Sequence, residues 1–432
     1  MSIPASHVLA AVLAALPSVL PSLVTAQEAT GTRDTTLPLP APADQTPAIV
    51  EAAEAFLATL SEEQREAVLF DWSDDAQRAN WTNFPEGGSP SPRAGARWGE
   101  LDDTQRAALM EMLGTLLSFD GLRMVQEQMA ADDVVAANDT GPGGPPAGEA
   151  PADASEAPAD AAEGEETSSE TPGELASAEL AETASDEPAV AANDTVEAGA
   201  EGEEDDNDGP PDGERPPVNF GSDWYFVSIL GEPSDTEPFM IQFGGHHLAI
   251  NATVVGPDVT LSPTLTGGEP LKFTLNGRDV YIVEEEAVQA AQFLESLSEE
   301  QRGTAIVSDE RADLVLGPGQ DGQVLQPEGI AGADLDIQQR AQLLELIEAR
   351  LGILNADDLA ALMEPIAANL DETTFAWFGP TEPLGAAYWR VVGPTVILEF
   401  SPQANDGDVT DHAHNMYRDP TNEYGAAWTS AE

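Results

Sequence analysis

The sequence predicts an α+β fold in which two pseudo-repeated halves pack as one compact unit, each half combining a capped helix pair with antiparallel strands. Three observations predict it. A helix-start signature occurs four times, strand-like runs follow each helical stretch, and a long acidic segment interrupts the first half. Two copies of one helical unit favour an ancient duplication, with the acidic segment inserted into the first copy.

The signature has Leu, then Ser or Asp, and Gln three residues after that Ser or Asp. In such a capping box the Ser or Asp side chain accepts hydrogen bonds from amides of the first helical turn, while Gln reaches back to the cap amide. The pattern therefore predicts four helix N-termini. The four copies lie at residues 60–65, 101–106, 297–302 and 335–340.

Further elements follow the second helix of each half. Apolar residues at helical spacing occupy 121–135 and 356–370. Runs rich in aromatic and β-branched residues, bounded by turn residues, come next and predict strands packed in a mainly antiparallel sheet. These runs are 224–229, 239–243, 375–378, 388–392 and 396–400.

The segment 137–219 contains 24 acidic residues, one basic residue and no aromatic residue. Such a composition cannot bury enough apolar surface to offset the ordering entropy, so we expect disorder. The predicted segments are a signal peptide at 1–26, a flexible N-terminal segment at 27–48, the helical part of the first half at 49–136, the disordered acidic insertion at 137–219, the strands of the first half at 220–283, the second half at 284–428 and a tail at 429–432.

The N-terminus predicts export. Residues 8–24 are apolar and lead into Thr25-Ala26, a small-residue cleavage pattern. The run is short and broken by Pro17 and Pro21, which favours a cleaved signal peptide over a membrane span. We expect a secreted or periplasmic protein without a stable membrane anchor. The missing cysteines exclude disulfides and thiolate metal ligands.

The formal net charge is −63, and only one of the 16 basic residues, Lys272, is a lysine. A solvated acidic surface suited to a salty exterior explains this balance. Nucleic acid and anionic membranes are disfavoured as partners, because both require a basic surface.

Histidine usage carries the functional prediction. Apart from His7, which lies before the predicted cleavage point, the histidines form two pairs, His246-His247 and His412-Ala413-His414. Neutral imidazole is the commonest protein ligand for zinc and copper, and distant pairs can complete one coordination sphere. The sequence therefore predicts a metal site that holds copper or zinc.

Strand geometry sorts the four rings. Residues two apart on a strand point to the same side, so His412 and His414 can grip one ion. Adjacent residues point oppositely, unless the preceding glycines leave the first pair in irregular backbone. Alternation places His247 with polar neighbours and His246 with apolar ones, which makes His247 the expected third ligand and His246 a buried neighbour.

Residues around the second pair are predicted to support the site or to contact substrate. Asp411 and Asp419 are expected to orient an imidazole through its second nitrogen. Arg418, beside Tyr417, either binds an anionic group of a substrate or pairs with Asp419.

The histidine blocks also carry a resemblance. Together with residues 80–83, 93–101 and 316–322, the blocks 243–251 and 411–425 resemble the exported family catalogued as domain of unknown function number 3500. The resemblance covers nearly the whole chain outside the signal and the insertion, and it implies no established reaction. Asp411 and Ala413 depart from the amide and the larger apolar residue expected in relatives. The resemblance implies that the characteristic motif positions are His246, His247, His412, His414, Arg418, Asp419 and Tyr424.

The leading hypothesis is an exported metal-dependent enzyme acting on an extracellular small-molecule or polymeric substrate. Zinc would favour a hydrolase and copper an oxidoreductase. One alternative is a non-catalytic metal-binding or scavenging protein, and another is a surface interaction protein with structural histidines. An open coordination position separates the first two, and widely separated histidine pairs would indicate the third.

Overall fold

A computed structural model describes residues 45–89, 91–138, 218–404 and 407–429. The predicted signal peptide and nearly all of the predicted acidic insertion lie outside these residues. The described residues belong to one compact unit. None of their helices is long and apolar enough to cross a lipid bilayer.

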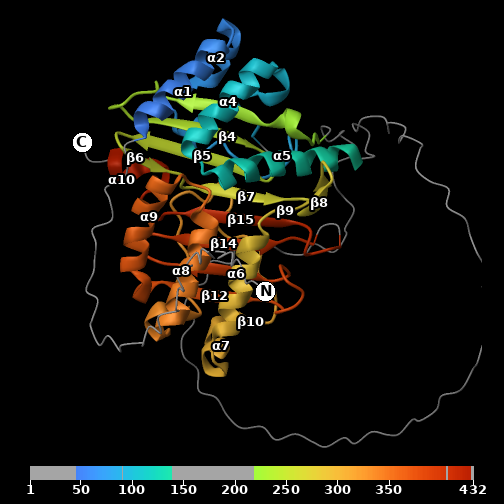
Figure 1. Ribbon diagram of the computed structural model, residues 1–432, viewed down its shortest axis with the longest axis vertical. Helices are drawn as coiled ribbons and strands as arrows, with labels where there is room; N and C mark the ends of the chain where they lie inside the picture. The colour runs from blue at the N-terminus through green and yellow to red at the C-terminus, as the bar shows by residue number, and fades with distance from the viewer. Residues whose placement is uncertain (1–44, 90, 139–217, 405–406, 430–432) are drawn as a thin grey trace, which may run out of the picture. The chain divides into compact units, whose positions relative to one another are not determined.

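The predicted mixture of helices and strands is confirmed (Figure 1). The α-helices of the described residues are α1 (Thr46–Thr59), α2 (Glu62–Val68), α3 (Asp75–Arg78), α4 (Asp103–Leu116), α5 (Phe119–Asn138), α6 (Glu284–Ser296), α7 (Glu299–Ala305), α8 (Ile337–Leu351), α9 (Ala356–Ala368) and α10 (Ala426–Thr429). The strands are β1 (Leu69–Phe70), β2 (Ala96–Arg97), β3 (Phe226–Leu230), β4 (Phe239–Gly245), β5 (Leu248–Val255), β6 (Asp258–Thr260), β7 (Thr264–Gly268), β8 (Lys272–Leu275), β9 (Arg278–Tyr281), β10 (Ile306–Ser308), β11 (Ile330–Ala331), β12 (Thr374–Phe378), β13 (Tyr388–Val392), β14 (Ile397–Pro402) and β15 (Ala413–Arg418).

All four predicted capping boxes form, at the starts of α2, α4, α7 and α8. The glutamines of two capping boxes also form side-chain hydrogen bonds with each other, Gln64 with Gln105 and Gln301 with Gln339. One predicted boundary is wrong: α1 begins at Thr46, inside the segment 27–48 that we expected to be flexible. A proline in the first turn explains this start, since its fixed φ suits a helix and its missing N–H costs nothing there.

The described strands form one 13-stranded sheet and a separate two-stranded one. The main path runs β1-β3-β4-β5-β7-β15-β14-β13-β12-β10. Its interior neighbours pair antiparallel, as predicted, whereas β1 on β3 and β10 on β12 pair parallel.

One arrangement of short strands occurs at both ends of this path. β1 lies parallel and β2 antiparallel to β3, and β10 and β11 lie in the same way on β12. In the middle, β7 pairs antiparallel with β15 and joins the two sets of strands. Duplication of the chain stays a prediction.

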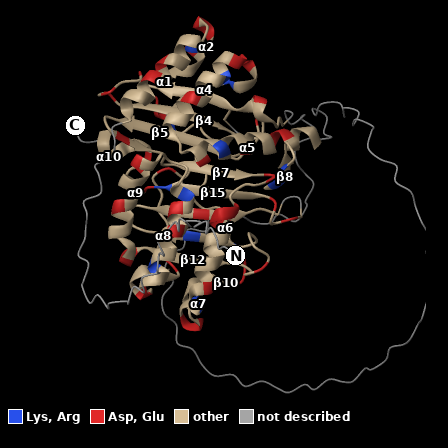
Figure 2. Cartoon of the chain, in the orientation of Figure 1, with Lys and Arg blue, Asp and Glu red and all other residues tan. Residues whose placement is uncertain are grey.

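One face of the sheet is apolar and covered by helices (Figure 1). Under α1 and α4, residues such as Ile241 and Phe243 of β4 pack into one core. Under α6 and α8, residues such as Trp389 and Phe400 pack into a second core. Acidic residues are spread over the helices and loops, with far fewer basic ones, consistent with a solvated acidic surface (Figure 2).

The opposite face carries many polar residues and is covered by loops and by the short helix α3. Gln242 of β4 and Ser228 of β3 share this face and bond to each other and to Gln77 of a covering segment. Near the other end of the sheet, the buried carboxylate of Glu399 on β14 accepts from the amides of Val315 and Leu316. These buried polar groups are paired, as burial without partners would be costly. His414 lies on this same face, opposite Ser401 of β14.

Candidate metal centre

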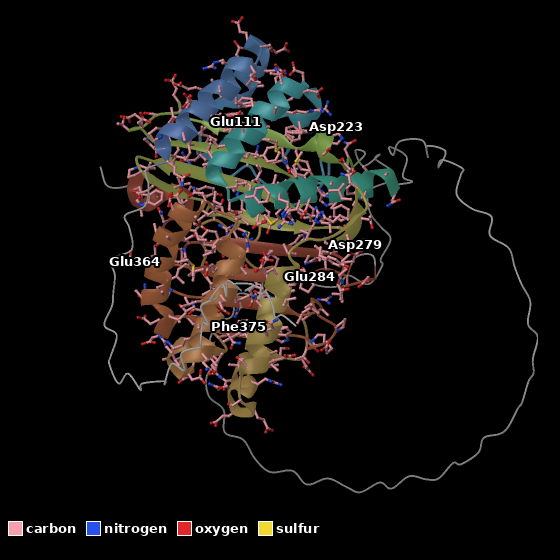
Figure 3. All side chains as sticks on the ribbon, viewed as in Figure 1. Glu111, Asp223, Asp279, Glu284, Glu364 and Phe375 are labelled. Atoms are coloured by element: carbon pink, nitrogen blue, oxygen red, sulfur yellow. The ribbon has the colours of Figure 1, made fainter. Side chains whose placement is uncertain are left out.

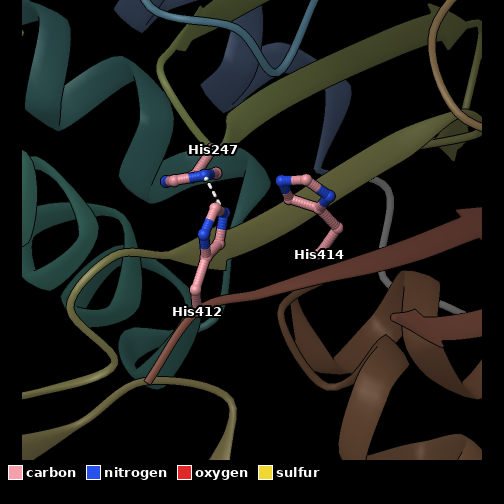
Figure 4. A group of neighbouring side chains, drawn as sticks. All are labelled: His247, His412 and His414. Carbon is pink, nitrogen blue, oxygen red and sulfur yellow. Dashed lines mark hydrogen bonds between the residues drawn. The ribbon is translucent and has the colours of Figure 1, made fainter. Parts of the chain in front are cut away.

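The structure brings His247 of the first histidine pair together with His412 and His414 of the second (Figure 4). His246 and His247 are the two turn residues between β4 and β5, where Gly245 pairs with Leu248. His247 has a left-handed φ of 60°, uncommon for a residue other than glycine, and its amide donates to the Asn83 carbonyl at 3.2 Å. The strand alternation used to sort the two rings therefore does not apply, because both residues lie in a turn.

His247, His412 and His414 each direct a ring nitrogen toward a common space, with the three ligand atoms within 4.8 Å of one another. The Nε2 atoms of His247 and His412 are 2.9 Å apart. Imidazole ligands of a tetrahedral zinc ion lie roughly 3.3 Å apart, from bonds of about 2.0–2.1 Å. Small ring movements would therefore seat one ion among them.

The loop containing Asn83 secures two sides of this space. The side-chain nitrogen Nδ2 of Asn83 lies 3.2 Å from His414 Nε2. Arg93 holds the loop, because its Nη2 donates to the carbonyls of Thr82 and Phe84 at 2.9 and 2.6 Å and to that of Gly245 at 2.8 Å. One guanidinium thus fixes both the loop and the strand end that leads into the histidine turn.

His246 supports the cluster from behind. Its Nδ1 lies 2.7 Å from Asp132 of α5, and its carbonyl accepts from the Tyr225 hydroxyl at 2.7 Å. Its ring stacks on that of His247, with 3.7 Å between ring centroids. The predicted roles, His247 in the triad and His246 as a buried neighbour, agree with this geometry.

A carboxylate lies beside His412 at the edge of the site. Glu269 Oε2 lies 3.4 Å from His412 Nδ1, and the Glu269 side chain is 27% exposed. A proton on Nδ1, facing Glu269, leaves Nε2 with its lone pair toward the common space. Glu269 also lies within 4.8 Å of ligand atoms of His246 and His247.

Electrostatics keep two of the rings neutral. Burial, followed by the neighbouring histidines, holds the pKa of His247 well below its ordinary value. Burial and the nearby His412 and His246 lower the pKa of His414 to about 3. Neutral imidazole is the form that binds metal, so both rings are ready ligands at neutral pH.

The two carboxylates predicted to orient an imidazole have other partners. Asp411 accepts from the Lys272 amide at 3.0 Å, and Asp419 accepts from the amide and hydroxyl of Thr421 at 2.8 and 2.7 Å. The orienting carboxylates in the structure are Glu269 and Asp132, so the assignment of that role to Asp411 and Asp419 was wrong.

Arg418 is fully buried and pairs with Asp321 and Glu423, at 3.1 and 2.5 Å, rather than with Asp419. The Tyr424 hydroxyl donates to the same Asp321 at 2.9 Å. Tyr417 lies on the helix-covered face of β15, opposite to the face of His414. Arg418, Tyr424 and Tyr417 therefore do not enter the triad.

Sequence reasoning missed three residues of the site. Asp132 lies on the buried stripe of α5, and an acid on an apolar helix face is a signal that was available. Asn83 was noted only within a block of the family resemblance. Glu269 stands between Gly268 and Pro270 at the end of β7, where no periodicity marks it.

Comparison with known proteins identifies a family but no reaction. No curated protein and no solved structure matches this chain. The family described as "Protein of unknown function (DUF3500)" matches residues 42–426. The chain therefore belongs to this family of unknown function, as the histidine blocks led us to expect.

Proposed function

We propose that His247, His412 and His414 bind one copper or zinc ion, and that the protein is an exported metal-dependent enzyme. The observation that carries the proposal is the convergence of three imidazole nitrogens, all within 4.8 Å. Three histidines with a further position left for water or substrate are typical of catalytic zinc sites, and copper accepts the same ligands. The absence of cysteine from the sequence leaves imidazole and carboxylate as the strong ligands.

The metal would decide the chemistry. Bound zinc lowers the pKa of a coordinated water and supports hydrolysis, whereas copper supports redox chemistry. Partial exposure of His414 and of the Glu269 side chain indicates the side from which an extracellular substrate would approach.

A non-catalytic metal-binding role is the second candidate. Its support is burial, since His247 and His412 are only 4% and 3% exposed. Azide added to the copper-loaded protein separates the two roles. A shifted electron paramagnetic resonance spectrum indicates an open position, and an unchanged spectrum favours storage.

We also propose that the site lies where two duplicated halves meet. His247 belongs to the first set of strands and His412 and His414 to the second, and the β7–β15 pairing joins these sets beside the histidines.

We propose export from the sequence of residues 1–26. N-terminal sequencing of protein recovered outside the cytoplasm tests this proposal.

Metal analysis tests the central proposal. Purified protein exposed to copper or zinc and then desalted should retain about one equivalent, from the three-ligand set. The His247→Ala/His412→Ala/His414→Ala variant should retain none. Asp411→Asn is the matched control, because its carboxylate faces the Lys272 amide. Equal metal content in the triple variant and the wild type would refute the site.

Metal binding should persist at mildly acidic pH. Protons compete with metal only below the pKa of each free ligand, and the pKa values of His247 and His414 are lowered. A histidine ligand with an ordinary pKa near 6.5 would weaken metal binding about thirtyfold at pH 5, and three such ligands would weaken it roughly 10⁴-fold. We expect at most about a thirtyfold loss between pH 7 and pH 5, measured by calorimetric titration. A loss near the larger figure would contradict the neutral-ligand description.

Glu269→Gln should weaken metal affinity by about 10–100-fold, as is usual for carboxylates that orient a histidine ligand. The amide keeps the shape of the side chain but loses the charge facing His412 Nδ1. Competition with a coloured chelator measures the change, with Asp411→Asn again as the control. Equal affinities for the two variants would remove Glu269 from the site.

A further inference from the structure

A second polar cluster lies on the other side of β15, under the helices. At its centre is Arg350 of α8, which is fully buried. Its Nη2 donates to the carbonyls of Thr264 on β7 and Asn415 on β15, at 2.9 and 3.2 Å. Its Nε and Nη1 have no hydrogen-bond partner. One of the three guanidinium nitrogens is therefore hydrogen-bonded, and the other two are not.

Two neighbours of Arg350 share this property. The Tyr417 hydroxyl and the Asn415 Oδ1 are buried without a hydrogen-bond partner, and both residues are at most 2% exposed. Both side chains lie on the same face of β15, and Tyr417 is in register with Thr264, whose carbonyl Arg350 holds. Unpaired buried polar groups in one place indicate an occupant that supplies their partners.

The positive charge of Arg350 also lacks a close counter-ion. Among the described residues, no ion pair within 4.0 Å involves its guanidinium. The acid that faces it is Glu286 of α6, the helix on which Glu284 is labelled in Figure 3. Its Oε1 already accepts from Asn415 Nδ2 at 2.9 Å. A buried guanidinium without a close carboxylate is costly unless another anion compensates it.

The ionisation of these groups agrees with this description. Burial lowers the pKa of Arg350 to about 10, so the side chain stays charged at neutral pH. Burial raises the pKa of Glu286 to about 7, so its carboxyl is partly protonated there. Glu286 is then an incomplete counter-ion.

We propose that a chloride ion binds on the helix side of β15, held by Nε and Nη1 of Arg350 and by the hydroxyl of Tyr417. These groups supply N–H and O–H donors around one positive charge, which suits a small monovalent anion. The Asn415 carboxamide, turned by half a rotation, adds its Nδ2 as a donor and presents Oδ1 to protonated Glu286. The site is separate from the histidine triad, because Asn415 and Tyr417 face away from His414 across β15.

Thermal unfolding of the full chain in sodium chloride and in sodium gluconate, at equal ionic strength, tests the proposal. We expect a Tm higher by about 2–4 °C in chloride. Tyr417→Phe, which removes one donor and little volume, should shrink this difference, and Arg350→Met should abolish it. Arg123→Met is the matched control, since Arg123 is half exposed and pairs with Asp120 on the surface, and it should keep the full difference.

Bromide provides a direct readout that does not depend on whether Arg350→Met folds. Crystals grown in sodium bromide should show an anomalous peak between Arg350 and Tyr417, and crystals of Tyr417→Phe a weaker one. A Tm that is equal in the two salts, or density for water alone at this place, would overturn the assignment. Neither result would affect the metal proposal, which is tested by metal content.

Discussion

Replacement of His247 by alanine is expected to weaken metal affinity by more than about 100-fold, beyond the 10–100-fold usual for residues that only support a ligand. His247 lies close to both other rings of the triad. Its Nε2 lies 2.9 Å from that of His412, and its ring centroid lies 5.1 Å from that of His414. Alanine removes the one ligand that comes from the β4–β5 turn, so only the rings of His412 and His414 would remain. Competition titration with a chelator of known affinity measures the loss.

His246→Ala is the matched control, because it removes the adjacent imidazole of the same turn. His246 directs Nδ1 to Asp132 and stacks on His247, so its loss should affect metal binding only through the position of that ring. We expect about 10–100-fold weaker binding. A larger loss from His246→Ala than from His247→Ala would show that the two rings have exchanged roles, and the ligand set would have to be redrawn.

Local patterns predicted the parts of the fold that local physics determines. A capping box needs only a side chain and amides three residues away, so α2, α4, α7 and α8 were predictable from short motifs. Strand β13 was predicted with its observed bounds, 388–392, because aromatic and β-branched residues fill it.

Strand β7 shows why other elements were missed. Its sequence, Thr-Leu-Thr-Gly-Gly, is short and ends in two glycines, a residue type that is depleted in strands. Its conformation comes from pairing with β15 along most of its length, and Gly267 there tolerates a close approach of the Ala413 carbonyl. Such pairing is a property of the assembled sheet, and no local window contains it.

The residues of the site also differ in how well local sequence predicted them. The four histidines were predictable because they are rare and paired in the sequence. The groups that orient them were not, since Asp132 and Glu269 reach His246 and His412 from distant segments of the chain. Asp411 and Asp419 were favoured because they are neighbours in sequence, yet adjacent residues in an extended chain point in different directions.

The second large effect concerns stability. Arg418→Met is expected to lower the free energy of unfolding by about 3–5 kcal/mol, the usual cost of removing one partner of a buried ion pair. Arg418 is fully buried and donates to the carbonyls of Leu316 and Gly317, both at 2.9 Å, besides its pairs with Asp321 and Glu423. Methionine fills similar space but removes the guanidinium that donates to two carboxylates and two carbonyls.

Urea unfolding, followed by tryptophan fluorescence, measures this loss. Arg123→Met, which breaks a surface pair, should change the free energy of unfolding by less than about 1 kcal/mol. The double variant Asp321→Asn/Glu423→Gln in the Arg418→Met background should recover part of the stability, because the uncompensated charges are then gone. Recovery there would assign the cost to stranded carboxylates. An Arg418→Met variant as stable as the wild type would instead show that the loops over the polar face are held without this ion-pair network.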